Sequence, residues 1–450
     1  MSAATIVAIT VALLCPASAA AAQDGPPTYG LDELVERALA ENSDVAVSRW
    51  QVRSARAQLR EAQAASILPR LRWESVSGLV PEAKGDVTAL HTDTTGIRPL
   101  GPFVKAELDF IQPLFTFGQL QLLRQAAEAG VEVEKAALAG TCAQVTLEVK
   151  ELYYGILLAQ DLSDLARRLR EELKGWEGDV GDGSDPDIPL SAPYKLQLTL
   201  LQLRVGEREL ADQLALARSA LAWKVGLDSA DFELAEKWLE PAPTRVPDVD
   251  QLFSQALQHR SDWRQLRSGI VARRAQEEAA RRAYYPQIFL AGGLRYAVAP
   301  GRTDQHNPFI KDEFNLFNGG LFLGVRQSLE LGMLGAKVDR ARAQRHQLES
   351  MEHSAAQGIR IDLQDAHDAF HRAESSLQSA KEARNLTREW VQLAQDEYDL
   401  DPSQINGLVS AFEGLAGSEE AYYRALYDFN IGLAKLERTV NMDLRDREVD

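Results

Sequence analysis

Apolar residues recur at alternating three- and four-residue spacings over two very long stretches of the chain. In residues 118–174 this series is Leu120, Leu123, Ala127, Val131, Leu138, Cys142, Val145, Val149, Leu152 and Ile156. In residues 334–399 it is Ile359, Leu363, Ala366, Phe370, Ala373, Leu377 and Ala380. This spacing predicts α-helices that pack as coiled coils. At 1.5 Å per residue each helix is roughly 90–100 Å long, which exceeds a compact domain.

Two shorter segments alternate instead with a period of two. In the first, Val104, Ala106, Leu108 and Phe110 share one face, opposite Lys105, Glu107 and Asp109. In the second, Leu321, Leu323 and Val325 lie opposite Phe322, Gly324 and Arg326. Such alternation predicts strands with one apolar face. Two interpretations stay open at this point: a soluble sheet packed on the helices, or a transmembrane barrel with lipid outside and water inside.

The chain also repeats itself. "LDELVERALAENSD" (31–44) matches "VDQLFSQALQHRSD" (249–262), and "FIQPLFTFGQLQLLRQAAEA" (110–129) matches "GVRQSLELGMLGAKVDRARA" (324–343). In both copies a proline, Pro69 or Pro286, ends a helical run before a strand. A constant offset of roughly 215 residues indicates a tandem duplication. We expect a first repeat over 23–248, a second over 249–441 and a C-terminal tail over 442–450.

Each repeat therefore reads helix, strand, loop, strand, very long helix, turn, helix. The predicted fold is mainly α-helical with a pair of β-hairpins, which supplies four strands per chain. Unpaired strand edges are not tolerated in lipid, so a membrane barrel would need several chains. Three copies would supply twelve strands, a number that such barrels use.

Residues 1–22 are uncharged, with an apolar run from Ile6 to Leu14 and small residues up to Ala22. This predicts a secretory signal peptide and an exported protein. Cys15 raises the alternative of a lipoprotein signal, although Leu14 before it is larger than such a site usually allows. Beyond this segment Cys142 is the one cysteine, which excludes an internal disulfide, and no apolar run reaches the length of about 20 residues that a spanning helix needs.

The net charge is −17. An acidic chain lacks the positive field that nucleic acids and anionic membrane surfaces attract, so no nucleic-acid partner is expected. An exported chain without a membrane helix, but with alternating hairpins, favours the barrel interpretation.

Residues 30–441 resemble the TolC-like outer-membrane efflux proteins. The resemblance rests on the duplicated helix "LDELVERALAENSD", the proline before the first strand, "QPLFTFGQL" and the closing "YYRALYDFNIGLAKLERTV". It implies a homotrimer in which a twelve-stranded outer-membrane barrel continues as a helical tunnel through the periplasm. It also implies a passive exit duct for efflux or type I secretion, docked on a periplasmic adaptor (membrane fusion) protein and an inner-membrane pump of RND or ABC type. No catalysis, cofactor or metal is implied.

The resemblance places the tunnel entrance at the helix–helix turns, residues 175–189 and 399–406. The family's adaptor-binding Val-Gly-Leu pattern is reduced here to Val180-Gly181, and its entrance aspartates would fall near Gly407 and Ser410, with a basic partner near Ser403. What remains is a set of acidic side chains: Asp179, Asp182, Asp185, Asp187, Asp399 and Asp401. They form either a negative entrance ring that favours cations or ordinary turns, which Asp-Pro and Asp-Gly sequences favour.

Four histidines lie in the second long helix: His346, His353, His367 and His371. The last two have the four-residue spacing of a zinc-binding pair, but the pattern around them predicts a solvated stripe rather than a metal site. The sequence contains no HExxH, GxSxG or GxxxxGK[ST] motif. Besides a duct, the alternatives are an exported coiled-coil stalk without a channel and a periplasmic chaperone or enzyme.

Overall fold

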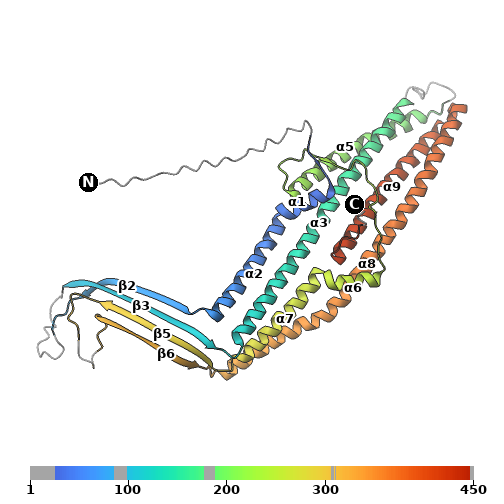
Figure 1. The fold of residues 1–450 in the computed structure, drawn as a ribbon. Coiled ribbons are helices and arrows are strands. Elements are labelled where there is room, and N and C mark those ends of the chain that lie inside the picture. Colours follow the sequence, from blue (N-terminus) through green and yellow to red (C-terminus); the bar gives the residue numbers. More distant parts are fainter. Residues whose placement is uncertain (1–25, 86–98, 177–187, 306–308, 310, 446–450) are drawn as a thin grey trace, which may run out of the picture.

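A small β-sheet projects from one end of a long layer of helices (Figure 1). This arrangement comes from a computed structural model, which describes residues 26–85, 99–176, 188–305, 309 and 311–445. The acidic residues Asp179, Asp182, Asp185 and Asp187 and the predicted signal peptide lie outside the described residues. The prediction of a mainly helical chain with a few strands is confirmed.

The order of elements runs twice along the chain. The first set comprises α1 (Leu31–Glu41), α2 (Ser43–Ile67), β2 (Arg70–Pro81), β3 (Leu100–Phe115), α3 (Gln119–Gly175) and α5 (Ala192–Val225). The second comprises α6 (Val249–His259), α7 (Ser261–Arg282), β5 (Gln287–Val298), β6 (Leu316–Arg326), α8 (Leu331–Leu400) and α9 (Ile405–Val440), with the short 3-10 helix η1 (Pro402–Gln404) between the last two. Helices α3 and α8 have 57 and 70 residues, which makes them about 85 and 105 Å long.

Local chemistry explains where several helices begin and end. The side chain of Asn42 separates α1 from α2 and accepts a hydrogen bond from the backbone N–H of Asp44 at 2.9 Å, which is the N-cap role that asparagine favours. Helix α2 ends at Ile67 because Pro69 follows. Gly118, with φ of 84°, turns the chain from β3 into α3, a conformation that glycine adopts without strain. Helix α7 ends at Arg282, four residues before the proline that was expected to stop it.

The four long strands form one antiparallel sheet in the order β2-β3-β5-β6. Strands from the two halves of the chain meet at β3 and β5, where Leu108 lies opposite Leu294. A register shift between Pro113 and Phe115 marks the point at which β3 leaves the sheet toward α3. Two very short strands, β1 (Thr28–Tyr29) and β4 (Glu233–Leu234), pair in parallel near α1.

The helices lie side by side as a single layer with two borders. Next to the sheet the order is α2, α3, α7 and α8, and at the far end it is α5, α3, α9 and α8 (Figure 1). Helices α3 and α8 run through both levels and join them. Within the described residues, no helix combines the length and the apolar composition that crossing a membrane requires.

The apolar core consists of three clusters spread along the layer rather than one centre. The predicted seam is buried at Val145, Val149 and Ile156 of α3 and at Ile359, Leu363 and Phe370 of α8. Leu123 is an error of the sequence prediction, because its side chain is exposed. Near the sheet α3 packs through the small residues Ala126 and Ala129 instead.

A connecting segment between α5 and α6 is held against the helices by two buried polar side chains. Asp161 of α3 accepts a hydrogen bond from the backbone N–H of Leu239 at 2.9 Å. Asn430 of α9 accepts from the N–H of Ala242 and donates to the carbonyl of Glu240, at 2.9 and 2.8 Å. These bonds satisfy backbone groups of an irregular segment that would otherwise be buried without partners.

The pKa of Asp161 leads to a prediction about stability. Burial raises this pKa to about 6, although the Leu239 N–H opposes the change. Since the folded protein then holds the proton more tightly than the unfolded chain, ionised Asp161 lowers the free energy of unfolding by roughly 3 kcal/mol at neutral pH. This penalty is lost as the pH falls through 6 toward 4. We therefore expect Asp161→Asn to raise the thermal unfolding midpoint at pH 8 and to raise it less at pH 5.

The matched control is Glu172→Gln, about three turns further along α3, where the residue is exposed and is not among the groups that shift the pKa of Asp161. This variant should not reproduce the pH-dependent gain. An equal effect of Asp161→Asn at both pH values would contradict the prediction. Circular dichroism during thermal unfolding provides the measurement.

Candidate functional site

The sheet has two chemically different faces. Val104, Ala106, Leu108 and Phe110 lie on one face as predicted, and the strand register adds apolar neighbours from the other three strands. These neighbours are Leu71, Trp73, Leu294, Tyr296, Phe317, Leu321, Leu323 and Val325. Trp73 and Leu323 are 67% and 71% exposed, so this face is a broad apolar surface that the helices leave uncovered. A contiguous exposed apolar surface that spans four strands marks contact with lipid or with another chain.

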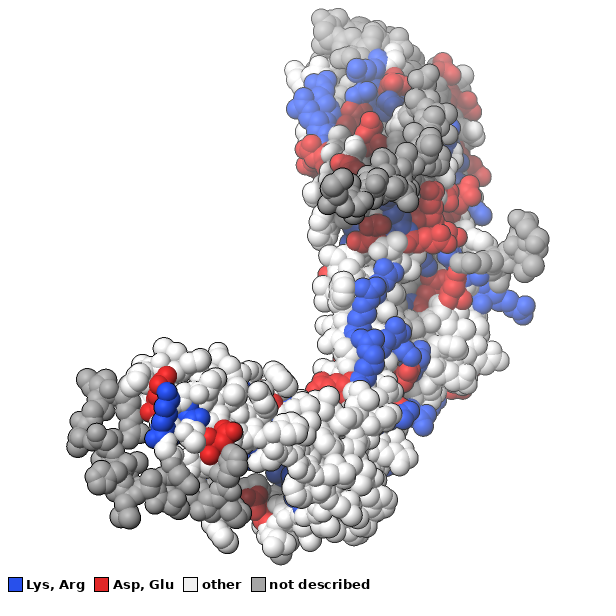
Figure 2. All heavy atoms as spheres, turned by 60° about the vertical axis from the view of Figure 1, so that its left-hand side comes forward, with Lys and Arg blue, Asp and Glu red and all other residues white. Residues whose placement is uncertain are grey.

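The opposite face carries charged side chains near its centre. Glu107 pairs with Lys105 at 2.8 Å and lies 3.6 Å from Arg295, while Arg72 pairs with Glu74 at 2.9 Å. Register places Glu74, Glu107 and Arg295 in one row across three strands. Figure 2 shows acidic and basic side chains gathered on the sheet end amid uncharged surface. Because the two signs are paired, this face is polar without a large net charge.

Close packing within the sheet depends on several glycines, as two of them show. A Cβ on Gly292 would meet the ring of Phe110 at 2.4 Å, and one on Gly324 would meet the ring of Phe289 at 2.5 Å. Aromatic side chains therefore lie across these strands.

Both borders of the structure are open. Strands β2 and β6 are the outer strands of the sheet, and α5 and α8 border the helical layer at its far end. Helix α5 exposes Tyr194, Leu198, Leu201 and Val205, while α8 exposes Leu386, Trp390, Leu393 and Leu400. Both series follow heptad-like spacing, which is the pattern of a helix that packs on a further helix. We call these two series the border stripes.

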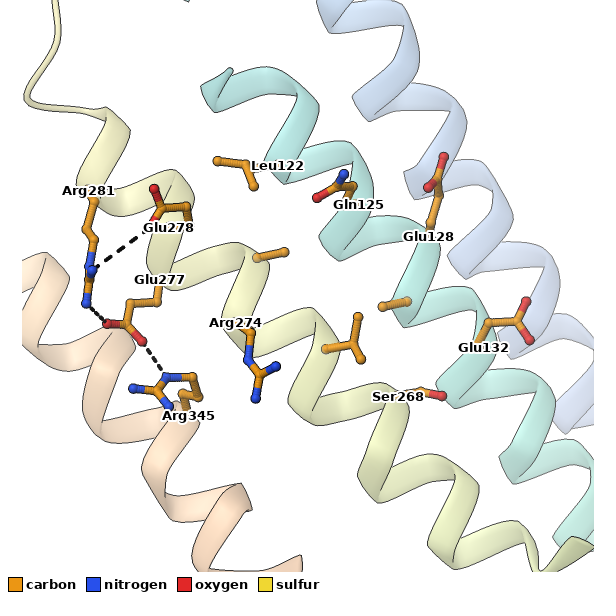
Figure 3. A pocket seen from close by; sticks show the side chains of 13 residues that line it. Leu122, Gln125, Glu128, Glu132, Ser268, Arg274, Glu277, Glu278, Arg281 and Arg345 are labelled. Atoms are coloured by element: carbon orange, nitrogen blue, oxygen red, sulfur yellow. Dashed lines mark hydrogen bonds and ion pairs between the residues drawn. The ribbon is translucent and has the colours of Figure 1, made fainter. Parts of the chain in front are cut away.

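A groove of about 790 Å³ lies between α3 and α7 close to the sheet (Figure 3). Gln125, Glu128 and Glu132 line it from α3, and Ser268 and Arg274 line it from α7 (Figure 3). Both glutamates of α3 are paired with basic residues of the same helix outside the groove, Glu128 with Arg124 and Glu132 with Lys135. The lining therefore combines apolar side chains, such as Leu122 and Val271, with charges that are already paired.

At the end of this groove Glu277 is buried among arginines. Arg281 donates to Glu277 at 2.6 Å and Arg345 of α8 donates at 2.5 Å (Figure 3), with Arg342 at 3.6 Å. Burial raises the pKa of Glu277, but hydrogen bonds from Arg345 and Arg281 outweigh it, and the pKa is lowered overall. This carboxylate stays ionised and ties α7 to α8 next to the sheet.

We expect Glu277→Gln to lower the free energy of unfolding by about 1.5–3 kcal/mol, because it removes the charge-assisted hydrogen bonds from Arg281 and Arg345 to a buried carboxylate, while Arg345 keeps Glu349 as a partner. Glu278→Gln is the matched control, since Glu278 is partly exposed and pairs with Arg282 on its own helix. It should cost less than about 1 kcal/mol. Denaturant unfolding monitored by circular dichroism compares the two, and equal losses would contradict a special role for Glu277.

The described part of the helix–helix turns supports ordinary turn chemistry at one of the predicted residues. Asp401 accepts a hydrogen bond from the N–H of Ser403 at 3.0 Å and caps η1. Hydrogen bonds from the hydroxyl and the backbone of Ser403 lower its pKa. Asp399 is exposed on the last turn of α8.

Sequence reasoning missed a polar link at the same end. Lys195 of α5 donates to the hydroxyl of Ser410 at 2.7 Å and lies 3.5 Å from Glu413 of α9. Ser410 is one of the two positions at which the family resemblance would place an entrance aspartate. No spacing rule joins Lys195 to Ser410, because the contact depends on how α5 and α9 lie together.

These features define a class of protein. The chain superposes on solved outer-membrane channels over most of its length. It matches CusC with a TM-score of 0.73 at 17% identity, covering 91% of each chain, and MtrE of Neisseria gonorrhoeae with 0.73 at 17%, covering 92% of this chain and 89% of that one. CmeC of Campylobacter jejuni gives 0.73 at 14% identity, covering 93% and 87%. The fold is that of TolC-like outer-membrane channels, and the resemblance predicted from the sequence is confirmed.

Among curated sequences, the chain is 27% identical over 304 residues to the probable outer membrane lipoprotein SilC of Salmonella typhimurium. That match covers 64% of this chain and 62% of SilC, so it spans less than two thirds of the relative's length. No model of a known protein family matches the sequence.

Proposed function

We propose that this protein is a passive channel of the outer membrane that serves as the exit duct of a tripartite efflux or type I secretion system. The observation that carries the proposal is the open border that runs from the sheet into the helical layer. Strands β2 and β6 and the border stripes of α5 and α8 all lie where a second copy would continue the wall.

Closure by further copies follows from the energetics of these borders. Outer strands carry unpaired backbone groups, each of which costs several kcal/mol in hydrocarbon, and the border stripes leave apolar area in water at about 25 cal/mol per Å². A homotrimer pairs β6 of one copy with β2 of the next and yields a twelve-stranded barrel. It also brings α8 of one copy against α5 of its neighbour and closes a helical tunnel.

In this assembly the apolar face of the sheet, including Val104, Ala106, Leu108 and Phe110, contacts outer-membrane lipid. The charged face with Glu107 and Arg295 lines the water-filled pore, since lipid excludes such side chains. The helical tunnel extends into the periplasm, where a periplasmic adaptor and an inner-membrane pump of RND or ABC type deliver the cargo. Such a duct performs no bond chemistry and uses no cofactor. The predicted signal peptide, or a lipid on Cys15, directs the chain to this membrane.

Assembly can be tested at the border stripe of α8. We expect Leu386→Glu combined with Leu393→Glu to prevent trimer formation, because two carboxylates would be buried without partners. Native mass measurement in detergent should show a trimer for the unmodified chain and a monomer for the variant. Gln378→Glu, an exposed change on the same helix away from the stripe, should leave the trimer intact. A monomeric unmodified chain would favour a coiled-coil stalk.

We further propose that the acidic turns form a negative ring at the tunnel entrance by threefold repetition. The candidate residues are Asp182, Asp185, Asp187, Asp399 and Asp401. Replacing Asp182, Asp185 and Asp401 together with asparagine should reduce the preference of the single channel for cations severalfold, because ring charge raises the local cation concentration. Asp396→Asn, one turn up α8, is the control. Unchanged selectivity in planar bilayers would leave these residues with turn-forming roles alone.

A further inference from the structure

Two imidazole rings face each other on the surface of α8. The Nε2 atoms of His367 and His371 lie 3.2 Å apart, and the ring centroids are 4.4 Å apart in an edge-on arrangement. The prediction of a solvated stripe is wrong for His367, because its side chain is 15% exposed, against 47% for His371. Burial restricts the rotamers of His367 and so holds its Nε2 atom in place.

A carboxylate orients the second imidazole. Glu374 Oε2 lies 2.9 Å from His371 Nδ1, so that Nδ1–H donates to the carboxylate and Nε2 keeps its lone pair. This is the outer-shell arrangement that orients metal-binding histidines and increases their basicity. Phe370, with its ring centroid 5.5 Å from that of His371, packs against the same ring.

The separation of the two nitrogens matches a metal-binding geometry. Zinc binds imidazole nitrogen at about 2.0–2.1 Å with tetrahedral angles, which places two such nitrogens about 3.3 Å apart. We propose that His367 and His371 form a two-imidazole site for a borderline divalent transition-metal ion such as Zn²⁺. In the described part of the chain no group of three or more His, Cys, Asp or Glu side chains converges, so water completes the coordination.

The proton on His367 must move for the ion to bind. In the metal-free protein, one imidazole donates to the other across the 3.2 Å contact, and the buried Nδ1 of His367 has no hydrogen-bond partner. Because Nε2 of His371 accepts, His367 donates through Nε2–H, and its Nδ1 atom then carries an unshared lone pair. Metal binding at Nε2 transfers the proton to Nδ1, where the nearest carboxylate is Asp368 at 3.8 Å.

The site is independent of the channel proposal and compatible with it. At about 100° per residue, His367 lies about 40–60° from the seam residues Leu363 and Phe370, whereas His371 lies further from that seam, at about 80–100°. Packing within the chain therefore covers most of the His367 ring and leaves about half of the His371 ring accessible to an ion. An ion there would link two successive turns of α8.

Isothermal titration of the detergent-solubilised chain with Zn²⁺ tests this site. We expect one saturable Zn²⁺ per chain in the unmodified protein and at least a tenfold weaker affinity in His371→Ala. Glu374→Gln should weaken binding about tenfold, because outer-shell partners contribute at that level. The control is His353→Ala on the same helix, an exposed histidine that contacts Gln357, and it should bind as the unmodified chain does.

Two outcomes would overturn the proposal. One is the absence of a saturable Zn²⁺ component in the unmodified chain, and the other is an affinity that His371→Ala leaves unchanged. Because the side chain of His371 is half exposed, this variant should keep the circular dichroism spectrum of the folded protein, whereas His367→Ala removes packing as well. His371→Ala is therefore the deciding variant.

Discussion

The structure depends on a single constraint: the sheet and the helical layer are each one element thick, and each has two open borders. The sheet is four strands wide, and the helical layer is four helices wide at each level. Both bury apolar residues between neighbouring elements, but the outermost strands leave unpaired backbone groups and the outermost helices leave exposed apolar side chains. A single copy of the chain cannot pair these backbone groups or bury these side chains, so their exposure costs free energy. The two-faced sheet, the border stripes and the core in three separate clusters are consequences of this constraint.

A single layer of helices also needs interactions that fix the axial register of each helix against its neighbours. Seams of alanine and leucine tolerate small shifts along the helix axis, whereas buried ion pairs do not. The pair Lys150 with Glu437 is buried and joins α3 to α9, the partly buried pair Arg170 with Glu207 joins α3 to α5, and the buried Glu277 with the partly buried Arg345 joins α7 to α8. Such pairs contribute little net stability but specify one register, since breaking them leaves a buried charge. The C-terminal segment adds a further tie, in which Arg445 reaches Asp32 at 2.9 Å.

Much of the architecture was predictable because it rests on short-range periodicity. The ends of α3 and α8, the two faces of β3 and the break at Pro69 all follow from local patterns. The errors have a common cause. Leu123 fits the heptad but faces solvent, and His367 fits a polar stripe but is mostly buried, because neighbouring helices rather than the spacing decide which flank is covered. Asp161 and Asn430 gave no signal, since their partners are backbone groups of a distant irregular segment.

The amino-acid sequence alone determined the duplication, the two very long helices and the alternation that makes each strand two-faced. These properties depend on residues a few positions apart, and hydrophobic periodicity encodes them directly. Tertiary structure alone decided that β3 pairs with β5 across the two repeats, that arginines surround Glu277 and that the imidazoles of His367 and His371 face each other at 3.2 Å. Side-chain rotamers, burial and the lateral order of the helices set those contacts. The contacts therefore form only when the helices and strands have packed together.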